Sequence, residues 1–371
     1  MGLKKPTFVL SGRRGSVSAV GQARAYPNPR EAAQALRTGE CSGVVGALPF
    51  DLDAPAALWE PVDMTVSTEQ IDPIHPQRRG VTVVAREPEP AEHMRRVASL
   101  VERIRAGEAG KVVLARALTL GTDEAVDPIA LAGAFASGNA TRNAFAVALD
   151  AAGERYAGQW IVGASPELLV TRRGREVFCR PYAGTVPRSA DPVVDEQRAA
   201  SLRDSAKDLA EHAFVVEFLR ERLAPFCADI DVPDQPALLS TGELWHLATP
   251  ITATLADPAT TALDLALAMS PTPALGGTPS DVAAGLIAHY EGDRGFYGGA
   301  VGWCDDEGDG DWVVTIRCVG VAADRHRLTT WAGGGIVAES DPAVELAETT
   351  AKFATALRAL GADPAIAAES D

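Results

Sequence analysis

Cysteine and histidine, the side chains that most often form disulfides or bind transition metals, are scarce in this sequence of 371 residues. The five cysteines are scattered and never stand in a Cys-x-x-Cys spacing, and none of the six histidines has the spacing of metal ligands. Scattered cysteines in odd number are typical of reduced thiols that serve as packing residues. We therefore expect a cytoplasmic protein without a disulfide framework or a zinc site.

Basic residues and long apolar runs are also few. The 34 lysines and arginines are outnumbered by 50 acidic residues, so the net charge is −16. That charge argues against nucleic acid or an anionic membrane surface as a partner. No run approaches the roughly 18 apolar residues of a membrane-spanning helix, and the stretch after Lys5 is too short for a secretory core. A small-molecule ligand is the remaining expectation, and an anionic one would require local positive charge.

A four-residue pattern, an acid followed by Leu, Ala and Glu, occurs twice. It places Asp208 three residues before Glu211 and Glu345 three residues before Glu348. Residues three apart share one face of a helix, and apolar residues recur at helical spacing around both pairs. Two such helices in one core would point four carboxylates at a common spot, which favours Mg²⁺. The alternative is two solvated helix faces.

The remaining patterns mix strands and helices without regular alternation, so the fold class we predict is α+β. Residues 1–90, rich in Gly, Pro and Arg, suggest strands and loops, with alternation over 7–10 and 43–50. The tail after Gly361 is small and polar, and we expect it to be frayed. Helices are expected over 91–106, 200–223, 261–270, 280–290 and in one last segment around 345–360; strands are expected over 111–116, 159–163, 168–172, 244–249, 297–305, 312–319 and 328–331, with one more just before Pro181.

An acidic stretch, 306–311, connects two of these strands and has the composition of a calcium loop. A calcium loop of the EF-hand type needs flanking helices and a Glu at its twelfth position. Apolar strands flank this stretch instead, so we predict a hairpin turn.

Two charged residues adjoin apolar strands and are candidates for acid–base chemistry. Lys111 opens an apolar strand, and because burial disfavours the ammonium form, it is a candidate general base. A lysine that guards a strand edge is the alternative. Glu167 lies between two apolar strands, where burial would keep it protonated as a general acid. Its alternative is a structural turn acid that accepts hydrogen bonds from backbone N–H groups.

Further residues suggest anion binding. The triplet 333–335 is Gly-Gly-Gly, which predicts either an anion-binding nest of backbone N–H groups or a plain flexible turn. Arg317 is a charge inside an apolar run and needs a carboxylate or phosphate partner. Lys352 lies four residues after the second Glu of the repeated pattern, so it is either a ligand for anions or a salt-bridge partner. Tyr297 and His246 are substrate-binding or core residues.

Taken together, these segments resemble the chorismate-utilising family, which includes isochorismate synthases, salicylate synthases and the first components of anthranilate and aminodeoxychorismate synthases. The resemblance runs in uninterrupted order from about residue 95 to 360, whereas the first ~90 residues match weakly. The matching stretches are GALPFD at 46–51, KVVLAR at 111–116, GASPELLV at 163–170, PYAGTVPR at 181–188, SAKDLAEH at 205–212, LWHLATP at 244–250, SPTPALGG at 270–277, FYGGAVGW at 296–303, VVTIRC at 313–318 and GGGIVAESDP at 333–342, with ELAETTAKF at the end.

The resemblance implies a fold and a set of site residues. The implied fold has two facing α/β subdomains around a large antiparallel β-sandwich, with residues 1–90 as a divergent part of the same domain and 91–360 as the chorismate-binding catalytic part. The implied metal is Mg²⁺, held by Glu211 and Glu348 with Asp208 and Glu345 beside them. The implied substrate-binding residues are Gly184, Thr185, His246, Ala274, Tyr297, Arg317, Gly334, Gly335 and Lys352.

Within this family, three positions discriminate between types. Relatives that use ammonia carry Gln where this sequence has Lys111, and the aminodeoxychorismate type has Lys where it has Ala183. Ala274 resembles the isochorismate type, because anthranilate and salicylate relatives tend to have Thr there. The resemblance therefore implies an isochorismate synthase of siderophore or menaquinone biosynthesis, in which Lys111 and Glu167 act as base and acid on chorismate. No glutamine amidotransferase subunit is expected; a salicylate synthase and a non-catalytic chorismate-binding subunit are the competing readings.

Overall fold

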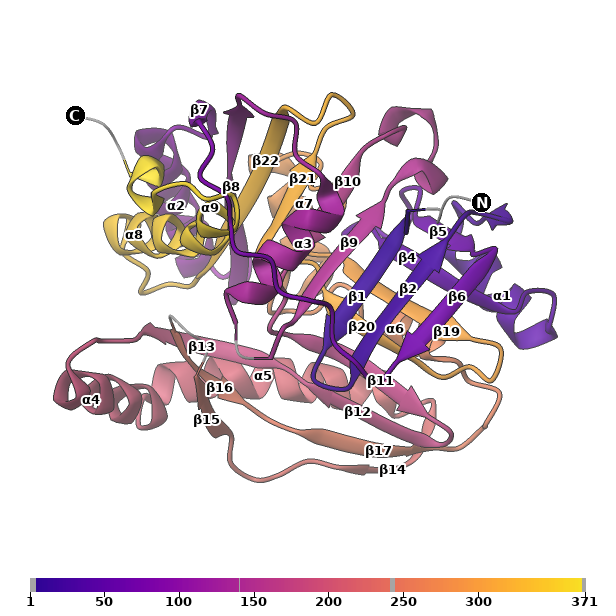
Figure 1. Cartoon of the computed structure of the whole chain (residues 1–371). Coiled ribbons are helices and arrows are strands. Elements are labelled where there is room, and N and C mark those ends of the chain that lie inside the picture. The colour runs from indigo at the N-terminus through magenta and orange to yellow at the C-terminus, as the bar shows by residue number, and fades with distance from the viewer. Residues whose placement is uncertain (1–4, 140, 241–243, 369–371) are drawn as a thin grey trace.

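A computed structural model describes residues 5–139, 141–240 and 244–368 of the chain. Two large antiparallel sheets face each other and share one core, in which Phe8 and Phe145 of the first sheet meet Trp59 and Trp303 of the second. Figure 1 shows the two sheets with helices on their outer sides. This β-sandwich flanked by helices confirms the predicted α+β class.

Strands from both ends of the chain build the first sheet. Its β8 also pairs with β7 (Val81–Glu87). In spatial order the sheet contains β18 (Gly277–Thr278), β8 (Lys111–Thr122), β22 (Arg327–Ile336), β21 (Cys318–Val321), β10 (Trp160–Gly163), β9 (Ala144–Ala148), β1 (Phe8–Gly12), β2 (Gly15–Val20) and β6 (Asp63–Ser67).

The second sheet is similarly mixed in chain order, and a small third sheet adjoins it. The third sheet consists of β13 (Tyr182–Pro187), β16 (Leu244–Ala248) and β15 (Ala237–Ser240). The second contains β14 (Cys227–Asp231), β17 (Ile251–Leu255), β12 (Glu176–Arg180), β11 (Leu168–Arg173), β20 (Gly310–Val314), β19 (Ala300–Asp305), β4 (Gly43–Leu48), β5 (Ala57–Glu60) and β3 (Arg24–Ala25).

Helices cover the outer face of each large sheet. Buried side chains of α1 (Pro29–Thr38), α5 (Ala206–Leu223) and α6 (Ala262–Met269) pack on the second sheet. Those of α3 (Pro128–Ser137) and α9 (Ala354–Ala359) pack on the first. Around β8 and β22 lie α2 (Pro90–Arg105), α7 (Ser280–Tyr290) and α8 (Pro342–Lys352). Every helix in the described part of the chain is too short or too polar to cross a membrane.

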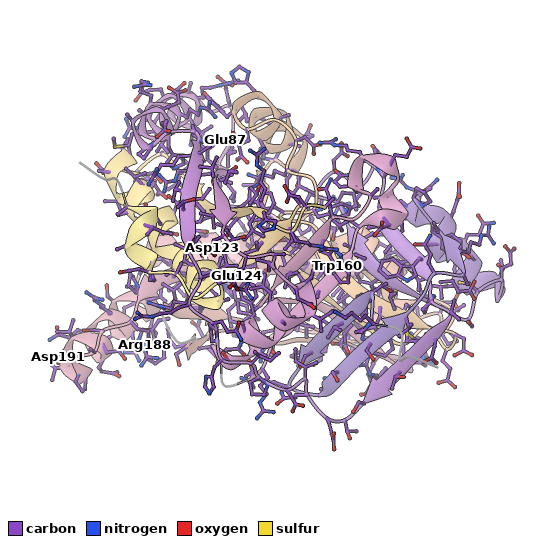
Figure 2. All side chains as sticks on the ribbon, turned by 45° about the horizontal axis from the view of Figure 1, so that its top comes forward. Glu87, Asp123, Glu124, Trp160, Arg188 and Asp191 are labelled. Atoms are coloured by element: carbon purple, nitrogen blue, oxygen red, sulfur yellow. The ribbon has the colours of Figure 1, made fainter. Side chains whose placement is uncertain are left out.

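The third sheet and α4 (Pro192–Arg203) form an arm at the outer end of the molecule, where Figure 2 labels Arg188 and Asp191. Asp195 ties this arm together, because its carboxylate accepts hydrogen bonds from Arg188 Nε at 2.9 Å and from Trp245 Nε1 at 3.1 Å. The Arg188 guanidinium also lies 4.5 Å from the centre of the Trp245 ring. The arm thereby presents β13 and β16 to the rest of the molecule in one orientation.

Most expected elements form, and the exceptions have local causes. The helix expected over 200–223 is two helices, because Asp204 leaves helical geometry and Ser205 caps α5 by accepting a hydrogen bond from the Asp208 N–H at 3.2 Å. The last helix also divides, at Phe353, one turn after Thr349 and Thr350. Their hydroxyls donate to carbonyls four residues back, at 3.0 and 2.8 Å, a pattern that bends helices.

The tail differs from the frayed segment that was expected. Residues 364–367 form a 3₁₀ turn, and Ala367 is buried in the core beneath the first sheet. The Arg86 guanidinium of β7 donates to the carbonyls of Ile366 and Ala368, each at 3.1 Å. The end of the chain up to residue 368 is therefore held against the sheet.

Two of the passages of the chain between the large sheets lie side by side. Residues 164–167 lead from β10 to β11, and residues 315–317 lead from β20 back to β21. The Ala164 N–H donates to the Arg317 carbonyl at 3.1 Å, and the Val314 N–H donates to the Glu167 carbonyl at 3.1 Å. We call these two segments the paired crossovers.

Gly163 allows the crossovers to approach this closely. A Cβ atom there would lie 2.7 Å from the Phe145 ring and 2.8 Å from the Arg317 carbonyl oxygen. We therefore expect Gly163→Ala to lower the free energy of unfolding by about 1–3 kcal/mol through overpacking, measured by urea denaturation.

Gly285→Ala is the matched control for that substitution. Gly285 lies inside α7, and a Cβ atom there would meet nothing within 4 Å. Alanine favours a helix interior over glycine by up to about 1 kcal/mol, so this variant should be at least as stable as the wild type. Equal stability of the two variants would contradict the close-approach argument.

Candidate functional site

The predicted site residues gather around one cavity of about 260 Å³ between α5, α8, β8 and the third sheet. A larger cavity of about 350 Å³ opens between the two large sheets. The smaller one is the candidate site, because every predicted site residue except Gly334 lines it. Its lining comprises Lys111, Val113, Pro166, Glu167, Tyr182, Ala183, Gly184, Thr185, Lys207, Asp208, Glu211, His246, Ala274, Leu275, Tyr297, Ile316, Arg317, Trp331, Ala332, Gly333, Gly335, Val344, Glu345, Glu348 and Lys352.

The two acid pairs reach this cavity from the first two turns of two capped helices, with Asp208 and Glu345 in the first turn of each. Ser205 caps α5 just before Asp208, and Asp341 caps α8 by accepting from the backbone N–H groups of residues 343 and 344. Carboxylates near a helix N-terminus are stabilised by the unpaired N–H groups and the helix dipole. All four carboxylates, those of Asp208, Glu211, Glu345 and Glu348, line one cavity, so the two helices face a common space.

Two lysines neutralise one acid of each pair. Lys111 Nζ lies 2.6 Å from Glu211 Oε1, and Lys352 Nζ lies 2.6 Å from Glu348 Oε1. Lys111 is only 8% exposed and stands in β8 between β18 and β22, so it is no edge lysine. Lys352 makes the salt bridge that its spacing allowed, and it also donates to the Gly333 carbonyl at 2.7 Å.

The pKa values of the two carboxyls of α8 are shifted in opposite directions. Burial raises the pKa of Glu345, and the negative charge of Glu348 adds to that effect. Burial also opposes ionisation of Glu348, but its ion pair with Lys352 and the nearby Arg317 charge outweigh burial and hold its pKa below the ordinary value. Glu345 accepts from the Ser340 hydroxyl at 2.7 Å, while its Oε2 atom is buried without a hydrogen-bond partner among the described residues.

The glycine triplet forms neither the nest nor the turn that its sequence suggested. Gly333, Gly334 and Gly335 lie in β22 and pair in antiparallel register with Ala115, Leu114 and Val113. In an antiparallel strand, consecutive N–H groups point toward opposite neighbouring strands, so they do not converge on one anion.

Instead, the triplet leaves room for charged side chains. A Cβ atom at 334 would lie 2.6 Å from Glu345 Oε2, and one at 335 would lie 2.7 Å from Lys111 Cε. Gly334 faces α8 and is not among the residues that line the cavity, and its role in substrate binding stays a prediction.

The donor set suits a hard divalent cation, although the described residues do not form a ready-made ligand cluster. No three described Asp, Glu, His or Cys side chains stand close enough together to hold an ion. Mg²⁺, however, usually binds one or two carboxylates and completes its shell with waters and substrate oxygens. Four carboxylates around one cavity, one of them with an unpartnered buried oxygen, fit that requirement.

Glu167 lies in the first crossover, across the cavity from the lysine of β8. It is 5% exposed, and burial raises its pKa to about 8, while a backbone hydrogen bond from Tyr182 and the charge of Lys111 act in the opposite direction. The carboxyl is therefore mostly protonated at neutral pH, as its position between two apolar strands predicted. A protonated carboxyl facing a cavity can donate a proton to a leaving oxygen.

Arg317 lies in the second crossover, rather than inside a hairpin strand as expected. Its backbone has φ of 51°, in the left-handed region that costs a non-glycine residue roughly 1–2 kcal/mol. Within residues 5–139, 141–240 and 244–368, no carboxylate lies within salt-bridge distance of its guanidinium. Burial lowers the pKa of the guanidinium, against the opposing influence of Tyr297 and Glu348. The expected anionic partner is thus not supplied by the described chain.

Aromatic rings form two walls of the cavity. Tyr297 is buried and stacks on Trp331 with ring centres 5.8 Å apart, and Tyr182 meets His246 edge-on at 5.3 Å. Burial lowers the pKa of His246 to about 3, and the charges of Arg317 and Lys352 add to the effect, so its imidazole is neutral.

Small residues complete the cavity wall. Thr185 pairs with His246 across β13 and β16, and Ala274 precedes β18. Gly184 adopts a φ of 77° at a β-bulge, and a Cβ atom there would lie 3.2 Å from the Cβ of Asp208. Glycine is therefore required at 184 both by its backbone and by the approach of α5.

Several lining residues were not predicted. Lys207 is adjacent to the first acid pair and lies four residues before Glu211, so helical spacing could have identified it. Trp331 is two residues before Gly333 in the same strand, and strand alternation places them on one face. Tyr182 and Ile316 reach the cavity only through the fold, since neither carries a local signal.

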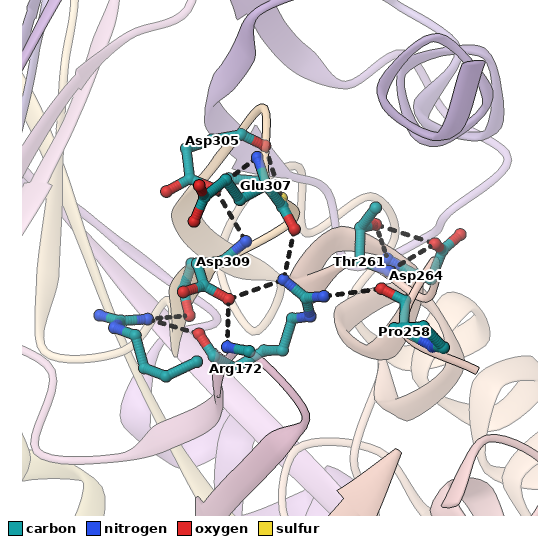
Figure 3. A network of polar contacts seen from close by, with 11 residues as sticks. Arg172, Pro258, Thr261, Asp264, Asp305, Glu307 and Asp309 are labelled. Carbon is teal, nitrogen blue, oxygen red and sulfur yellow. Dashed lines mark hydrogen bonds and ion pairs between the residues drawn. The ribbon is translucent and has the colours of Figure 1, made fainter. Parts of the chain in front are cut away.

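The acidic stretch 306–311 is a hairpin turn, as predicted, and the carboxylates of Asp309 and Asp311 are already paired with Arg172 and Arg173. Figure 3 shows Arg172 at its centre, donating to Asp309 Oδ1 and to the Glu307 carbonyl, each at 2.6 Å, and to the Pro258 carbonyl at 2.8 Å. The Asp305 carboxylate accepts from the backbone N–H groups of Glu307 and Asp309. This turn connects β19 and β20 and lies away from the cavity.

Comparisons with known proteins give one consistent result. A family profile described as "Chorismate binding enzyme" matches residues 53–361. A putative isochorismate synthase MenF of Mycobacterium tuberculosis is 48% identical over 362 residues, 97% of each chain. Isochorismate synthase DhbC of Bacillus subtilis is 44% identical over 340 residues, 89% of this chain and 85% of that one.

Solved structures agree with the described fold. A putative 2,3-dihydroxybenzoate-specific isochorismate synthase from Bacillus anthracis has a TM-score of 0.88 at 36% identity and covers 98% of both chains. The menaquinone-specific isochorismate synthase of Escherichia coli has a TM-score of 0.83 at 24% identity over 96% of this chain and 89% of that one. The second likeness concerns the fold alone.

The raised pKa of Glu167 predicts a pH-dependent stability. Its folded pKa of about 8 exceeds the unfolded value of about 4.3, so the folded state binds more protons than the unfolded state between these values. The contribution of Glu167 is therefore fully present below about pH 4 and is lost as the pH rises toward 8. In urea denaturation at pH 5, 6, 7 and 8, the free energy of unfolding of Glu167→Gln should increase relative to that of the wild type as the pH rises. A difference that stays constant with pH would contradict the raised pKa.

Proposed function

Because the chain belongs to the chorismate-binding enzyme family, we propose that it is an isochorismate synthase, an isomerase that converts chorismate to isochorismate. One observation carries the proposal: Lys111, in β8, and the protonated carboxyl of Glu167, in the first of the paired crossovers, line the same cavity. Relatives at 48% and 44% identity over most of their length bear the name isochorismate synthase. The type of residue at 111, a lysine, agrees with the use of water in place of ammonia.

In the proposed reaction, water adds at ring carbon 2 and the hydroxyl at ring carbon 4 departs as the double bonds shift. Lys111 takes the proton from the attacking water, and Glu167 gives its proton to the departing hydroxyl. To act as a base, Lys111 must be in its unprotonated amine form, and it therefore acts only after giving up both a proton and its ion pair with Glu211. Acid and base steps are each worth roughly 10²–10⁴ in rate, so positioning must supply much of the remainder.

The substrate's carboxylates find cations on two sides of the cavity. Arg317 faces the cavity from the crossover without a carboxylate partner among the described residues, and Lys352 and Lys207 lie on the helices opposite. A partly buried guanidinium in this state favours a carboxylate ligand, because its planar fork binds a carboxylate through two parallel hydrogen bonds. Tyr297, His246, Thr185 and the backbone at Gly335 line the space that remains for the ring and side chain.

We further propose Mg²⁺ as the cofactor, held by Glu211 and Glu348 with Asp208 and Glu345 beside them. The ion would supply positive charge at a substrate carboxylate in a site whose acids otherwise repel an anion. Glu345 Oε2 is a buried acceptor without a partner among the described residues, which supports a cation close to it.

The function is tested by incubating purified protein with chorismate and Mg²⁺ and identifying products by mass spectrometry. We expect isochorismate as the main product near neutral pH, with little salicylate, and no turnover after EDTA treatment. Glu348→Ala should likewise abolish turnover while the circular dichroism spectrum remains native. Salicylate with stoichiometric pyruvate from the start would establish a salicylate synthase instead, and full activity in EDTA would rule out the metal.

The role of Lys111 is tested by two substitutions that differ in charge. Lys111→Gln removes both the charge and the basic lone pair, whereas Lys111→Arg keeps the ion pair with Glu211 but cannot accept a proton near neutral pH. Both variants should lose isochorismate formation by at least about 10²-fold, with chorismate binding retained in isothermal titration calorimetry. An active Lys111→Arg variant would show that the residue serves only as a counter-charge.

A further inference from the structure

We propose that Glu291 and Arg294 are a positioning pair that fixes β8, and with it Lys111, relative to the substrate. The kinetic part of this proposal rests on the proposed function. Neither residue lines the cavity, and both lie between α7 and β19 in the wall behind it. Their side chains are 9% and 2% exposed, so they act from within the core and never meet the substrate.

The pair is joined by two parallel hydrogen bonds. Arg294 Nε donates to Glu291 Oε2 at 2.7 Å, and Nη2 donates to Oε1 at 2.5 Å. Such a bidentate pair is rigid, because the planar fork of the guanidinium matches the carboxylate. Every further bond made by either side chain therefore has a fixed direction.

Those further bonds go to the backbone of two segments that line the cavity. Glu291 Oε1 accepts from the Ala115 N–H at 2.8 Å, and Arg294 donates to the Val113 carbonyl at 2.9 Å. Arg294 also donates to the Leu275 carbonyl at 2.7 Å. Val113 and Leu275 line the cavity, and Lys111 begins the same strand.

The location of these bonds explains why side chains are needed. On one side, β8 pairs continuously with β22 as far as Val112. On the other side, β18 pairs only with residues 111 and 112, followed by one hydrogen bond from the Val113 N–H to the Gly276 carbonyl. From residue 113 until β7 begins to pair with β8 at Ala117, Glu291 and Arg294 supply the hydrogen bonds to Val113 and Ala115, so they continue the ladder in the gap between two strands.

Arg294 also orders an aromatic wall of the cavity. Its guanidinium lies 4.6 Å from the centre of the Phe50 ring and 5.8 Å from that of Tyr297. Tyr297 in turn stacks on Trp331, which lines the cavity. The buried pair of Glu291 and Arg294 thus contacts β8, which carries Lys111, as well as the segment around Leu275 and the aromatic wall.

A second buried arginine provides a matched comparison. Arg172 is also almost fully buried, pairs with one carboxylate, Asp309, and donates to two backbone carbonyls, but it holds the turn between β19 and β20 (Figure 3). Neither Arg172 nor Asp309 lines the catalytic cavity. If Arg294 were only a core residue, its replacement should act on the enzyme as the replacement of Arg172 does.

The test compares Arg294→Lys with Arg172→Lys in the full-length protein with Mg²⁺ bound. Lysine keeps the charge but cannot make the bidentate fork. Both variants should have a lower Tm, but at a temperature where both are fully folded only Arg294→Lys should lose kcat. The loss should be roughly 10–100-fold, the scale for misplaced catalytic groups, while the chorismate Kd changes less than about threefold.

Glu291→Gln provides a second variant, with hydrogen–deuterium exchange as a readout independent of turnover. The amides of residues 111–116 should exchange faster in Glu291→Gln and Arg294→Lys, whereas in Arg172→Lys they should exchange as in the wild type. Equal kcat in the two lysine variants, together with unchanged exchange over 111–116, would overturn the proposal. If the wild type proved inactive on chorismate, the proposed function would fail, while the exchange comparison would still decide whether the pair holds β8.

Discussion

The paired crossovers hold the two large sheets and the cavity in one arrangement. Hydrogen bonds from Ala164 to Arg317 and from Val314 to Glu167 join two chain segments that are about 150 residues apart in sequence. Each segment carries one charged or ionisable side chain into the cavity, and Gly163 lets the two backbones come within contact distance. The separation between the candidate acid and the candidate anion-binding arginine is therefore set by backbone pairing, which is stiffer than side-chain packing alone.

Electrostatics in the cavity contrasts with that of the molecule as a whole. The chain carries a net charge of −16, yet Lys111, Lys207, Arg317 and Lys352 all face one small space. Two of these cations are matched by acids of α5 and α8, which lets them be buried without an uncompensated charge. Neither Lys207 nor Arg317 forms a salt bridge with another described residue, and of the four cations only Arg317 has a left-handed backbone conformation. Backbone strain of this kind concentrates at functional sites, where the surrounding structure enforces it.

Much of the site could be predicted from sequence because its signals are local. Helical spacing placed Asp208 with Glu211 and Glu345 with Glu348, and an apolar run placed Lys111 in a strand. The pairing of Lys111 with Glu211 could not be predicted, because it joins residues 100 positions apart that meet only where the fold brings α5 and the start of β8 to the same cavity. Gly334 and its neighbours were misread because glycine has a low strand propensity, whereas here the lack of a Cβ atom is what the approach of charged side chains requires.

The pairing of β8 with β22 has a consequence for how the protein forms. Their residues lie some two hundred positions apart, and β4 is likewise paired with the distant β19. Contacts of such high sequence separation must close long loops before they contribute stability, so they form slowly. Until synthesis has passed residue 336, β8 lacks its main neighbour, and the apolar edge beginning at Val112 stays open to other chains. The candidate site is thus among the last parts of the nascent protein to assemble, and premature termination leaves an aggregation-prone edge in its place.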